Sequence, residues 1–245
     1  MTRSFAGKTY WIIGASEGLG RALAHALKAA GAEVIISARN SARLESLSSE
    51  LGGARAITLD VTNRQSVANA ADQAGRIDGL IYSVGLYEPM TAADWQPEAA
   101  EDMCEANFTG AMRVLGQTVP AMIAQNRGHV VLIGSLAGYR GLPGAIGYGA
   151  SKAALMHLAE NLHAETRNTG VVVQLANPGF IRTRLTDKNA FAMPMIMSPE
   201  QAASRVMKHM QSAKFQCDFP RPFSWLFIVG RFLPSWVFYR MIGSK

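Results

Sequence analysis

Short runs of β-branched and other apolar residues recur along the chain, and longer stretches with apolar residues at helical spacing lie between them. The apolar runs predict buried strands around Ile12, Ile35, Thr58, Ile81, Val131 and Val172. The longer stretches predict helices over residues 21–30, 41–51, 66–74, 111–126 and 150–167. This alternation predicts an α/β chain, a single-domain doubly wound Rossmann fold whose parallel sheet has about seven strands.

Composition narrows the function classes. The chain has 245 residues, 17% of them charged, and a net charge of +6. Its Lys and Arg residues are scattered rather than grouped in a basic run, which argues against nucleic acid as a partner. The only cysteines, Cys104 and Cys217, lie in no CxxC motif and near no His-rich cluster. We therefore expect neither a disulfide framework nor a metal site, and a reducing, cytoplasmic setting.

The last part of the chain has a different character. We expect residues 1–219 to form the dinucleotide-binding catalytic domain and residues 220–245 a hydrophobic helical extension of it. Arg231 and Pro234 argue against a spanning helix and favour two short amphipathic helices. We expect these helices to present an apolar surface formed by Trp225, Phe227, Phe232, Trp236 and Phe238. We expect solvent to surround the charged side chains of Arg221, Arg231, Arg240 and Lys245. Peripheral contact with the inner face of a membrane, capping of a pocket and burial between subunits all remain open.

A glycine-rich turn, GASEGLG, follows the first predicted strand. Gly14, Gly18 and Gly20 lie where a strand turns into a helix, together with Ser16 and Leu19. Glycine allows a tight turn and close approach to a pyrophosphate, while free N–H groups at the helix start face the anion. The alternative is a junction that merely requires small residues.

The end of the second predicted strand bears on the choice of cofactor. An acid there would bond the ribose 2′-hydroxyl, but ISARN offers none. The residues that can then face a 2′-phosphate are Ser37, Arg39 and Asn40, and this set favours NADP(H) as the cofactor. Glu17 in the glycine turn counts against this preference, so NAD(H) is not excluded, and Arg39 as a solvated loop charge is the alternative.

The third predicted strand ends in TLDVT. Asp60 there could accept a hydrogen bond from an adenine amino group, with Val61 beside it. An N-cap for the following helix is the alternative role for Asp60.

The stretch YGASK places a phenol and an ammonium on one helix face, at Tyr148 and Lys152. A nearby ammonium lowers the pKa of a phenol, which can then act as an acid or a base. Ser135 ends the fifth predicted strand, where its hydroxyl could hold a carbonyl oxygen; a helix cap or a turn is its alternative role.

The motifs GASEGLG, GSLAG, YGASK and NPGFIRT stand in the order and spacing of the short-chain dehydrogenase/reductase family, which the chain resembles over about residues 8–211. The resemblance implies a tetrad of Asn107, Ser135, Tyr148 and Lys152. Tyr148 would exchange the proton of the carbonyl oxygen, Ser135 would orient that oxygen, Lys152 would hold the nicotinamide ribose, and Asn107 would keep a water in a proton relay.

The resemblance also assigns NPGFIRT, with Pro178, Gly179, Ile181 and Thr183, to the nicotinamide amide and the adjacent phosphate. Two segments depart from the family pattern. Ile13 replaces a usual Thr, and residues 82–85, with Ser83 and Gly85 among the expected cofactor contacts, replace Asn-Asn-Ala-Gly. The resemblance further implies a homodimer or homotetramer.

The segment after NPGFIRT matches the family's variable substrate lid. It is rich in flexible apolar side chains, namely Phe191, Met193, Met195, Ile196 and Met197, which suit an apolar, lipid-like substrate or else fill core beneath a loop. We therefore expect an NADP(H)-dependent enzyme interconverting a ketone and a secondary alcohol. A non-catalytic dinucleotide sensor and an epimerase or dehydratase on a related fold are the alternatives.

Overall fold

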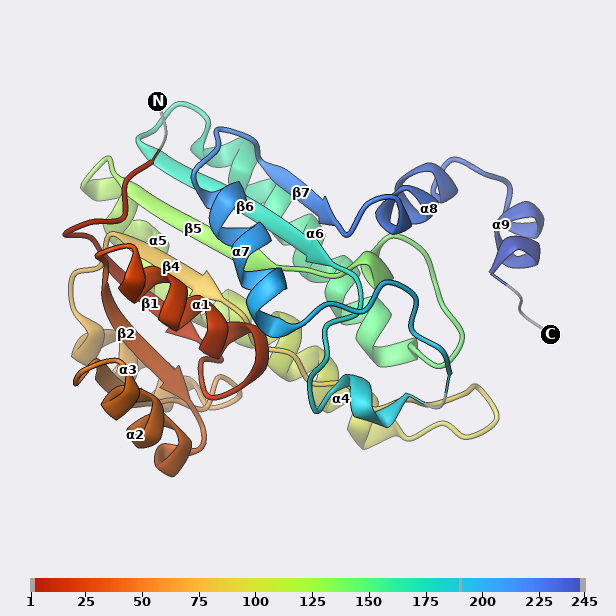
Figure 1. Ribbon diagram of the computed structural model, residues 1–245, viewed down its shortest axis with the longest axis horizontal. Helices are drawn as coiled ribbons and strands as arrows, with labels where there is room; N and C mark the ends of the chain where they lie inside the picture. The colour runs from red at the N-terminus through yellow and green to blue at the C-terminus, as the bar shows by residue number, and fades with distance from the viewer. Residues whose placement is uncertain (1–2, 190, 243–245) are drawn as a thin grey trace.

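The computed structural model describes residues 3–189 and 191–242, and in it one parallel sheet runs through the centre of the molecule (Figure 1). Its strand order is β3-β2-β1-β4-β5-β6-β7, and all six neighbouring pairs are parallel. The strands are β1 (Thr9–Ile13), β2 (Glu33–Ala38), β3 (Arg55–Thr58), β4 (Gly79–Tyr82), β5 (Gly128–Ile133), β6 (Val171–Pro178) and β7 (Gln216–Phe219). The predicted doubly wound fold is confirmed.

Helices connect the strands. They are α1 (Gly18–Ala29), α2 (Ser41–Glu50), α3 (Arg64–Ala74), α4 (Pro97–Cys104), α5 (Gly110–Ala124), α6 (Ile146–Thr166), α7 (Pro199–Met210), α8 (Phe223–Gly230) and α9 (Ser235–Met241). A π-helical turn, Glu105–Thr109, joins α4 to α5, and 3-10 turns lie at Leu136–Gly138 and Thr186–Lys188. Helix α6 begins at Ile146 instead of residue 150, which brings Tyr148 into its first turn.

Both faces of the sheet are buried. Along β1, Tyr10 and Ile12 point into a core shared with α1, α2 and α7, whereas Trp11 and Ile13 point into one shared with α3, α5 and α6. Successive side chains of a strand alternate between faces, so a strand covered on both sides must be apolar throughout. This explains the unbroken apolar runs in the sequence.

The strand order reverses between β1 and β4, which are neighbours although two strands separate them in the sequence. Ile13 is in register with Ser37 on one side and Tyr82 on the other. The loops that follow β1, β2 and β4 therefore leave the sheet at the same edge, where open α/β sheets bind their ligands.

The end of the described chain forms α8 and α9, which extend beyond the edge strand β7 (Figure 1). Helix α9 begins directly after Pro234, as the sequence predicted. Phe227 and Phe238 are buried, which corrects their assignment to the outer surface, and Lys245 lies outside the described residues. Between residues 3 and 242, Ala190 aside, the structure has no helix of the length and apolarity that crossing a bilayer requires.

Candidate active site

The glycine turn between β1 and α1 is sterically closed to larger residues. Gly14 has a φ of +88°, and a Cβ there would lie 2.9 Å from the backbone carbon of Ser83. A Cβ on Gly20 would lie 2.0 Å from the Gly14 carbonyl oxygen. The Leu19 side chain packs into the core, so only the backbone of this residue can contact a ligand. Ser16 is half-buried. The turn thus presents backbone to its outer side, as close approach to a phosphate requires.

The segment after β6 folds onto this turn. A Cβ on Gly18, whose φ is +55°, would lie 2.9 Å from the Thr183 Cγ2. Pro178 ends β6, Gly179 follows it, and Ile181 is buried. The two segments expected to hold the pyrophosphate and the nicotinamide are therefore in contact, and their backbone donors and small residues fit a dinucleotide.

The end of β2 corrects part of the expected phosphate site. The Ser37 side chain is buried and accepts a hydrogen bond from Trp11 Nε1 at 2.8 Å, so it does not face a phosphate. The Asn40 Oδ1 accepts from the backbone N–H of Arg43 at 2.9 Å and caps α2. Arg39 is exposed at the carboxyl edge of the sheet.

Glu17 in the glycine turn is held by two arginines that the sequence analysis did not single out. Its Oε2 lies 2.8 Å from Arg43 Nη1, and its Oε1 lies 2.5 Å from Arg184 Nη2. These contacts join the glycine turn to α2 and to the segment after β6. The negative charge that argued against a phosphate is therefore offset locally by two positive charges.

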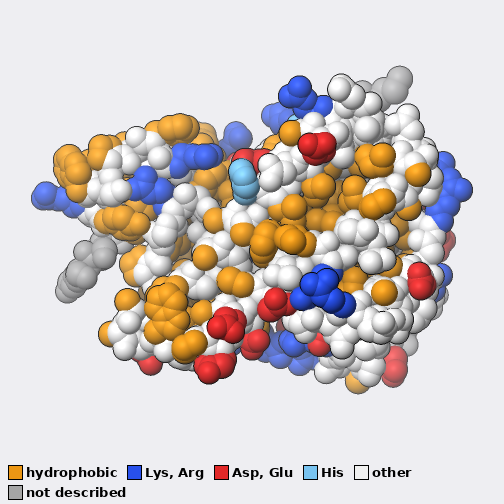
Figure 2. Space-filling view, turned by 180° about the vertical axis from the view of Figure 1, so that it is seen from behind, with side chains coloured by type: hydrophobic (Ala, Val, Ile, Leu, Met, Phe, Trp, Pro, Cys, Tyr) orange, Lys and Arg blue, Asp and Glu red, His pale blue; other side chains and the backbone are white. Residues whose placement is uncertain are grey.

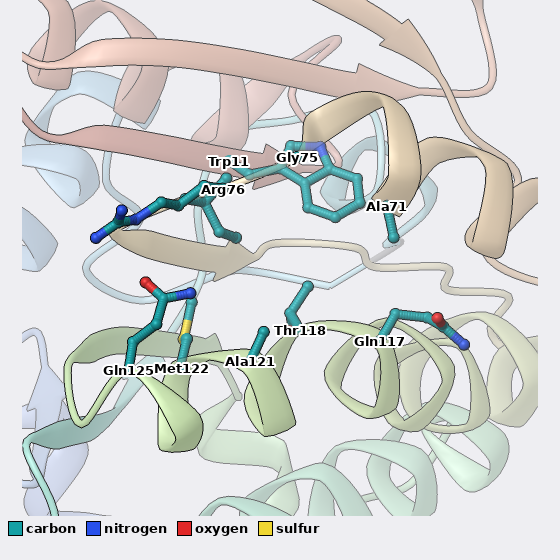
Figure 3. A pocket seen from close by; sticks show the side chains of 10 residues that line it. Trp11, Ala71, Gly75, Arg76, Gln117, Thr118, Ala121, Met122 and Gln125 are labelled. Atoms are coloured by element: carbon teal, nitrogen blue, oxygen red, sulfur yellow. The ribbon is translucent and has the colours of Figure 1, made fainter.

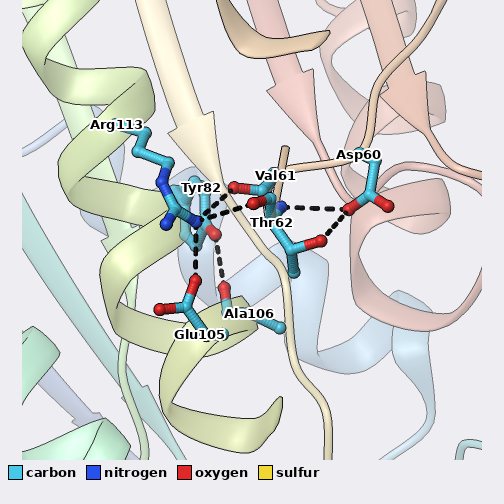
Figure 4. Close-up of polar contacts among 7 residues, drawn as sticks. All are labelled: Asp60, Val61, Thr62, Tyr82, Glu105, Ala106 and Arg113. Atoms are coloured by element: carbon cyan, nitrogen blue, oxygen red, sulfur yellow. Dashed lines mark hydrogen bonds and ion pairs between the residues drawn. The ribbon is translucent and has the colours of Figure 1, made fainter. Parts of the chain in front are cut away.

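Asp60 organises the loop after β3 (Figure 4). Its Oδ1 accepts from the Thr62 backbone N–H at 3.0 Å and from the Thr62 hydroxyl at 2.8 Å. Asn63, not Asp60, caps α3, so the N-cap alternative for Asp60 is wrong. Within this loop Val61 is buried.

Arg113 of α5 ties the same loop to the π-helical turn (Figure 4). It donates to the carbonyl oxygens of Val61 and Thr62 at 3.2 and 3.1 Å, and its Nη1 lies 2.7 Å from Glu105 Oε2. Tyr82, which departs from the family pattern, donates its hydroxyl to the Ala106 carbonyl at 2.6 Å. These contacts hold the π-helical turn against the end of β4.

Asn107 lies in that π-helical turn and is fully buried. Its Oδ1 accepts from the Leu86 N–H at 2.7 Å, and its Nδ2 donates to the Leu86 carbonyl and to Ser151 Oγ, both at 2.9 Å. Both amide hydrogens are thereby used within the protein. The side chain thus positions the loop after β4, with Ser83 and Gly85, against α6, and the water expected at this residue stays a prediction.

Ser135, Tyr148 and Lys152 converge at the carboxyl end of β5. Ser135 is buried, and its Oγ accepts from the Ala137 N–H at 3.1 Å, as the capping alternative predicted. The Lys152 Nζ lies 5.9 Å from the centroid of the Tyr148 ring and donates to the carbonyl oxygens of Val84 and Ile133 at 3.1 and 3.0 Å. The phenol, the hydroxyl and the amine therefore share one site beside the glycine turn.

Burial controls the ionisation of this site. It raises the pKa of the Tyr148 phenol, hydrogen bonding with the Ser135 side chain opposes the rise, and Tyr87 adds to it. Burial also lowers the pKa of Lys152 to about 7. The expected depression of the phenol's pKa by a neighbouring ammonium is thus corrected: desolvation disfavours the charged form of both groups, and Ser135 is the group that lowers the phenol's pKa.

The predicted lid segment contacts Tyr87, whose ring lies against Tyr148. Lys188 contacts Glu88 and donates to the Tyr87 carbonyl at 3.1 Å, while the Tyr87 hydroxyl donates to Asn189 Oδ1 at 2.9 Å. The Tyr87 ring meets the Tyr148 ring edge-on, with centroids 5.2 Å apart. The lid's apolar residues divide between the two interpretations: Phe191 and Met195 are exposed, Met193 and Ile196 are half-buried, and Met197 packs on the core.

A cavity of about 50 Å³ between α3 and α5 does not belong to this site (Figure 3). Trp11, Ala71, Thr118 and Met122 line it, toward the amino ends of the strands. Small-molecule pockets usually enclose about 300–1,000 Å³, so this cavity has the size for water rather than for a substrate.

Ser151 and Tyr87 are further residues of the site that were not predicted from the sequence. Ser151 lies inside the YGASK motif and links Asn107 to α6, because its hydroxyl donates to the Tyr148 carbonyl at 2.9 Å. Its place between Tyr148 and Lys152 was the available signal. Tyr87 carries no such signal, since its contact with Asn189 joins segments far apart in the sequence.

Comparison with known proteins agrees with this arrangement. The family described as short chain dehydrogenase matches residues 8–193. An uncharacterized oxidoreductase of Myxococcus xanthus is 34% identical over 221 residues, 87% of each chain. The 3-oxoacyl (acyl-carrier-protein) reductase FabG of Escherichia coli is 31% identical over 188 residues, 75% of this chain and 77% of that protein.

A solved structure matches almost the whole chain. It is a short chain dehydrogenase from Burkholderia cenocepacia in complex with NADP, with a TM-score of 0.87 at 25% identity, covering 99% of this chain and 100% of that one. The fold, the arrangement of the motifs and these likenesses agree. The chain therefore belongs to the short-chain dehydrogenase family, whose members are oxidoreductases that bind a nicotinamide dinucleotide.

Proposed function

We propose that this chain is an NADP(H)-dependent oxidoreductase that interconverts a ketone and a secondary alcohol on a small apolar substrate. One observation carries the proposal. Tyr148 lies beside the buried Lys152, whose Nζ is 5.9 Å from the centre of its ring, and the turn that Ser135 caps packs on the same helix, where the Ser135 side chain lowers the pKa of the phenol. A proton donor and a second hydrogen-bond donor are then available to one carbonyl oxygen.

The chemistry follows from these groups. A bound nicotinamide supplies or accepts the hydride. In reduction, Tyr148 would give its proton to the carbonyl oxygen as the carbon gains the hydride, so the C=O double bond becomes a C–O single bond, new C–H and O–H bonds form, and the phenol is left as phenolate. The Ser135 hydroxyl donates to the same oxygen and stabilises the charge that develops on it. In oxidation, Tyr148 takes the hydroxyl proton back.

Lys152 and Asn107 support this step in different ways. Lys152 has its pKa lowered to about 7, so it exchanges a proton readily near neutral pH, and we assign it the nicotinamide ribose as a partner. Asn107 acts through Leu86 and Ser151, which makes it a positioning residue. It fixes the loop after β4 relative to α6, and hence the distance between that loop and Tyr148.

The preference for NADP(H) rests on charge at the end of β2. Arg39 is exposed there, and the Glu17 carboxylate that would repel a 2′-phosphate is already held by Arg43 and Arg184. Arginine suits a phosphate because its planar guanidinium donates two parallel hydrogen bonds. The solved relative in complex with NADP supports the same choice.

The apolar character of the substrate rests on the lid. Phe191 and Met195 are exposed next to half-buried Met193 and Ile196, and Phe191 meets Phe180 with ring centroids 5.8 Å apart. Flexible thioether side chains adapt to irregular apolar ligands. We also propose a homodimer or homotetramer, as the family resemblance implies, and sedimentation velocity tests this assembly. The absence of a CxxC motif in the sequence supports a reducing, cytoplasmic setting.

Oxidation of NADPH with a panel of hydrophobic ketones tests the proposal. The wild-type chain should turn over at least one of them, and Tyr148→Phe should lose turnover while NADPH binding, measured by fluorescence, is retained. Binding without turnover across the panel would assign the chain to the sensor alternative instead. Equal turnover in Tyr148→Phe would remove the phenol from the mechanism.

A further inference from the structure

The α8–α9 unit, residues 221–242, is a folded surface rather than a loose tail. Phe227 and Phe238 are buried within it. A Cβ on Gly230 would lie 2.7 Å from the Phe238 ring, so α8 and α9 pack closely where Gly230 leaves room. The residues on the outer side of the unit are therefore held in a fixed arrangement.

Arg140 fastens this unit to the active-site loop. Its Nη1 donates to the carbonyl oxygens of Gly230 and Leu233, both at 3.1 Å, and its Nη2 donates to Ser235 Oγ at 3.2 Å. Its guanidinium carbon lies 4.8 Å from the centre of the Phe238 ring. Because Arg140 lies between Ser135 and Tyr148 in the chain, the unit contacts the loop that joins these two candidate catalytic residues.

The outer side of the unit is apolar and positively charged. Phe232 is 80% exposed, Trp236 is 72% exposed and Trp225 is 53% exposed, far more than large aromatic side chains usually are. Arg221, Arg231 and Arg240 are also exposed, and residues 219–242 contain no Asp or Glu. Figure 2 shows orange and blue side chains side by side on this lobe, at the left of the view.

A line of aromatic rings connects the unit to the lid. Phe191 meets Phe180 at 5.8 Å, Phe180 meets Phe223 at 5.8 Å, and Phe223 meets Phe227 at 5.2 Å, measured between ring centroids. Phe180 belongs to the segment that lies on the glycine turn. An apolar path thus leads from the outer unit toward the substrate side of the candidate site.

We propose that the α8–α9 unit docks on an anionic lipid bilayer, lying in its interface without crossing it, and that the apolar substrate reaches the site from that bilayer; the second part rests on the proposed function. Exposed Trp and Phe side chains partition into the interface, and arginines attract anionic headgroups. A second copy of the chain fits less well. Two such surfaces packed face to face would bring like charges together without an acidic partner.

Sedimentation with vesicles tests the docking directly. The wild-type chain should sediment with phosphatidylcholine vesicles that contain phosphatidylglycerol and much less with phosphatidylcholine alone. Combined Trp225→Ser, Phe232→Ser and Trp236→Ser should lower the bound fraction at least about tenfold, because the interfacial anchors are lost. Combined Arg221→Gln and Arg240→Gln should remove the preference for phosphatidylglycerol.

Trp95→Ser is the matched control, since Trp95 is 55% exposed in the loop before α4. It should sediment as the wild type does. A wild-type chain that stays in the supernatant with both vesicles overturns the proposal, as does equal loss in Trp95→Ser. A dimer that the triple variant dissociates, with no vesicle binding by the wild type, would assign the surface to a second copy.

Measuring the turnover of a water-soluble and of a vesicle-bound ketone distinguishes failure of the membrane proposal from failure of the proposed enzymatic function. The triple variant should retain turnover of a water-soluble ketone and lose turnover of an apolar ketone presented in vesicles. Vesicle binding by a wild-type chain that reduces no ketone would refute the enzyme and the delivery of substrate but retain the docking. Turnover of both ketones at equal rates in wild type and triple variant would refute the delivery.

Discussion

Two clusters of buried polar side chains occupy opposite ends of the sheet. At the carboxyl ends of the strands, Lys152 is 2% exposed and its pKa is lowered to about 7. At the amino ends, His129 is equally buried, and its pKa is lowered to about 3, chiefly by burial. Both clusters shift the pKa of a titratable group strongly, so a shifted pKa does not by itself distinguish a site from a structural network.

The partners of the two groups make the difference. His129 hydrogen-bonds Tyr10 at 2.8 Å and Gln174 at 2.7 Å, and Gln174 Nε2 donates to the carbonyl oxygens of His209, Ser212 and Lys214. Arg3 joins this network from the segment before β1, and the contacts tie the ends of β1, β5, β6 and α7 together. Lys152, by contrast, lies beside a phenol, a hydroxyl and a glycine turn whose outer side is backbone. The His129 cluster at the amino ends stabilises the fold, and the Lys152 cluster at the carboxyl ends is arranged to act on a ligand.

The largest effect should come from Lys152→Met. We expect kcat/KM with NADPH and a ketone to fall by about 10²–10⁴, because the site loses the amine beside the phenol. The fold should persist, since Met has similar length and no charge to bury. Activity and thermal unfolding, measured on the same preparation, check both parts. A variant that unfolds as it loses activity would make the carboxyl-end cluster structural, like the other.

Gln174→Leu should produce the opposite pattern. Three backbone carbonyls and His129 would lose a buried partner, so we expect the free energy of unfolding to fall by about 3 kcal/mol. The kcat/KM should stay near the wild-type value, because the change lies at the far end of the sheet. Urea unfolding and steady-state kinetics provide the two measurements. Gln73→Leu, on the exposed side of α3, is the matched control and should leave unfolding unchanged.

Lowering the pH should reduce the folding stability of the protein through the protonation of His129 in the unfolded chain. In the unfolded chain its pKa is near 6.5, whereas in the folded chain it is about 3. Between these values the unfolded state binds more protons, so stability is full above pH 6.5 and falls as the pH drops, by at most about 1.4 kcal/mol per pH unit from this group. Urea unfolding between pH 7 and 5 should show a steeper loss in the wild type than in His129→Gln. Equal slopes would refute the assignment.

Arg39→Ala should give the smallest of these effects. It should change cofactor binding at the carboxyl end of the sheet and leave the His129 cluster unchanged. We expect the KM for NADPH to rise about tenfold, because a charge-assisted bond to the 2′-phosphate is worth roughly 1.4 kcal/mol, while the KM for NADH stays unchanged. Steady-state kinetics with both cofactors decide this. Arg205→Ala, on the exposed side of α7, is the matched loss of charge and should change neither KM. A parallel rise in both KM values would remove the phosphate contact.

Much of this architecture follows from local pattern. The apolar runs predicted the strands because a parallel sheet is buried on both faces. The glycine turn was predictable because φ values of +88° at Gly14 and +55° at Gly18 exclude most other residues. Pro234 marked the break between α8 and α9 for an equally local reason.

Other features escaped the sequence because they depend on partners that are distant along the chain. Ser37 was expected at a phosphate, yet Trp11 reaches it across the neighbouring strand. No local pattern predicted that a π-helical turn aims the Asn107 amide at Leu86 and Ser151. Hydrogen bonds across such separations are set by the register of strands and the placement of helices, which no local pattern encodes.

The sequence by itself determined which residue types stand at the carboxyl edge of the sheet, since strand ends and glycine turns are local properties of the chain. Only the tertiary structure decided what those residues do to one another. Folding left Lys152 buried and Tyr148 half-buried, and desolvation is the largest cause of the pKa shift of each group. It also placed Arg140 against the α8–α9 unit, because packing brings together segments that about ninety residues separate in the chain.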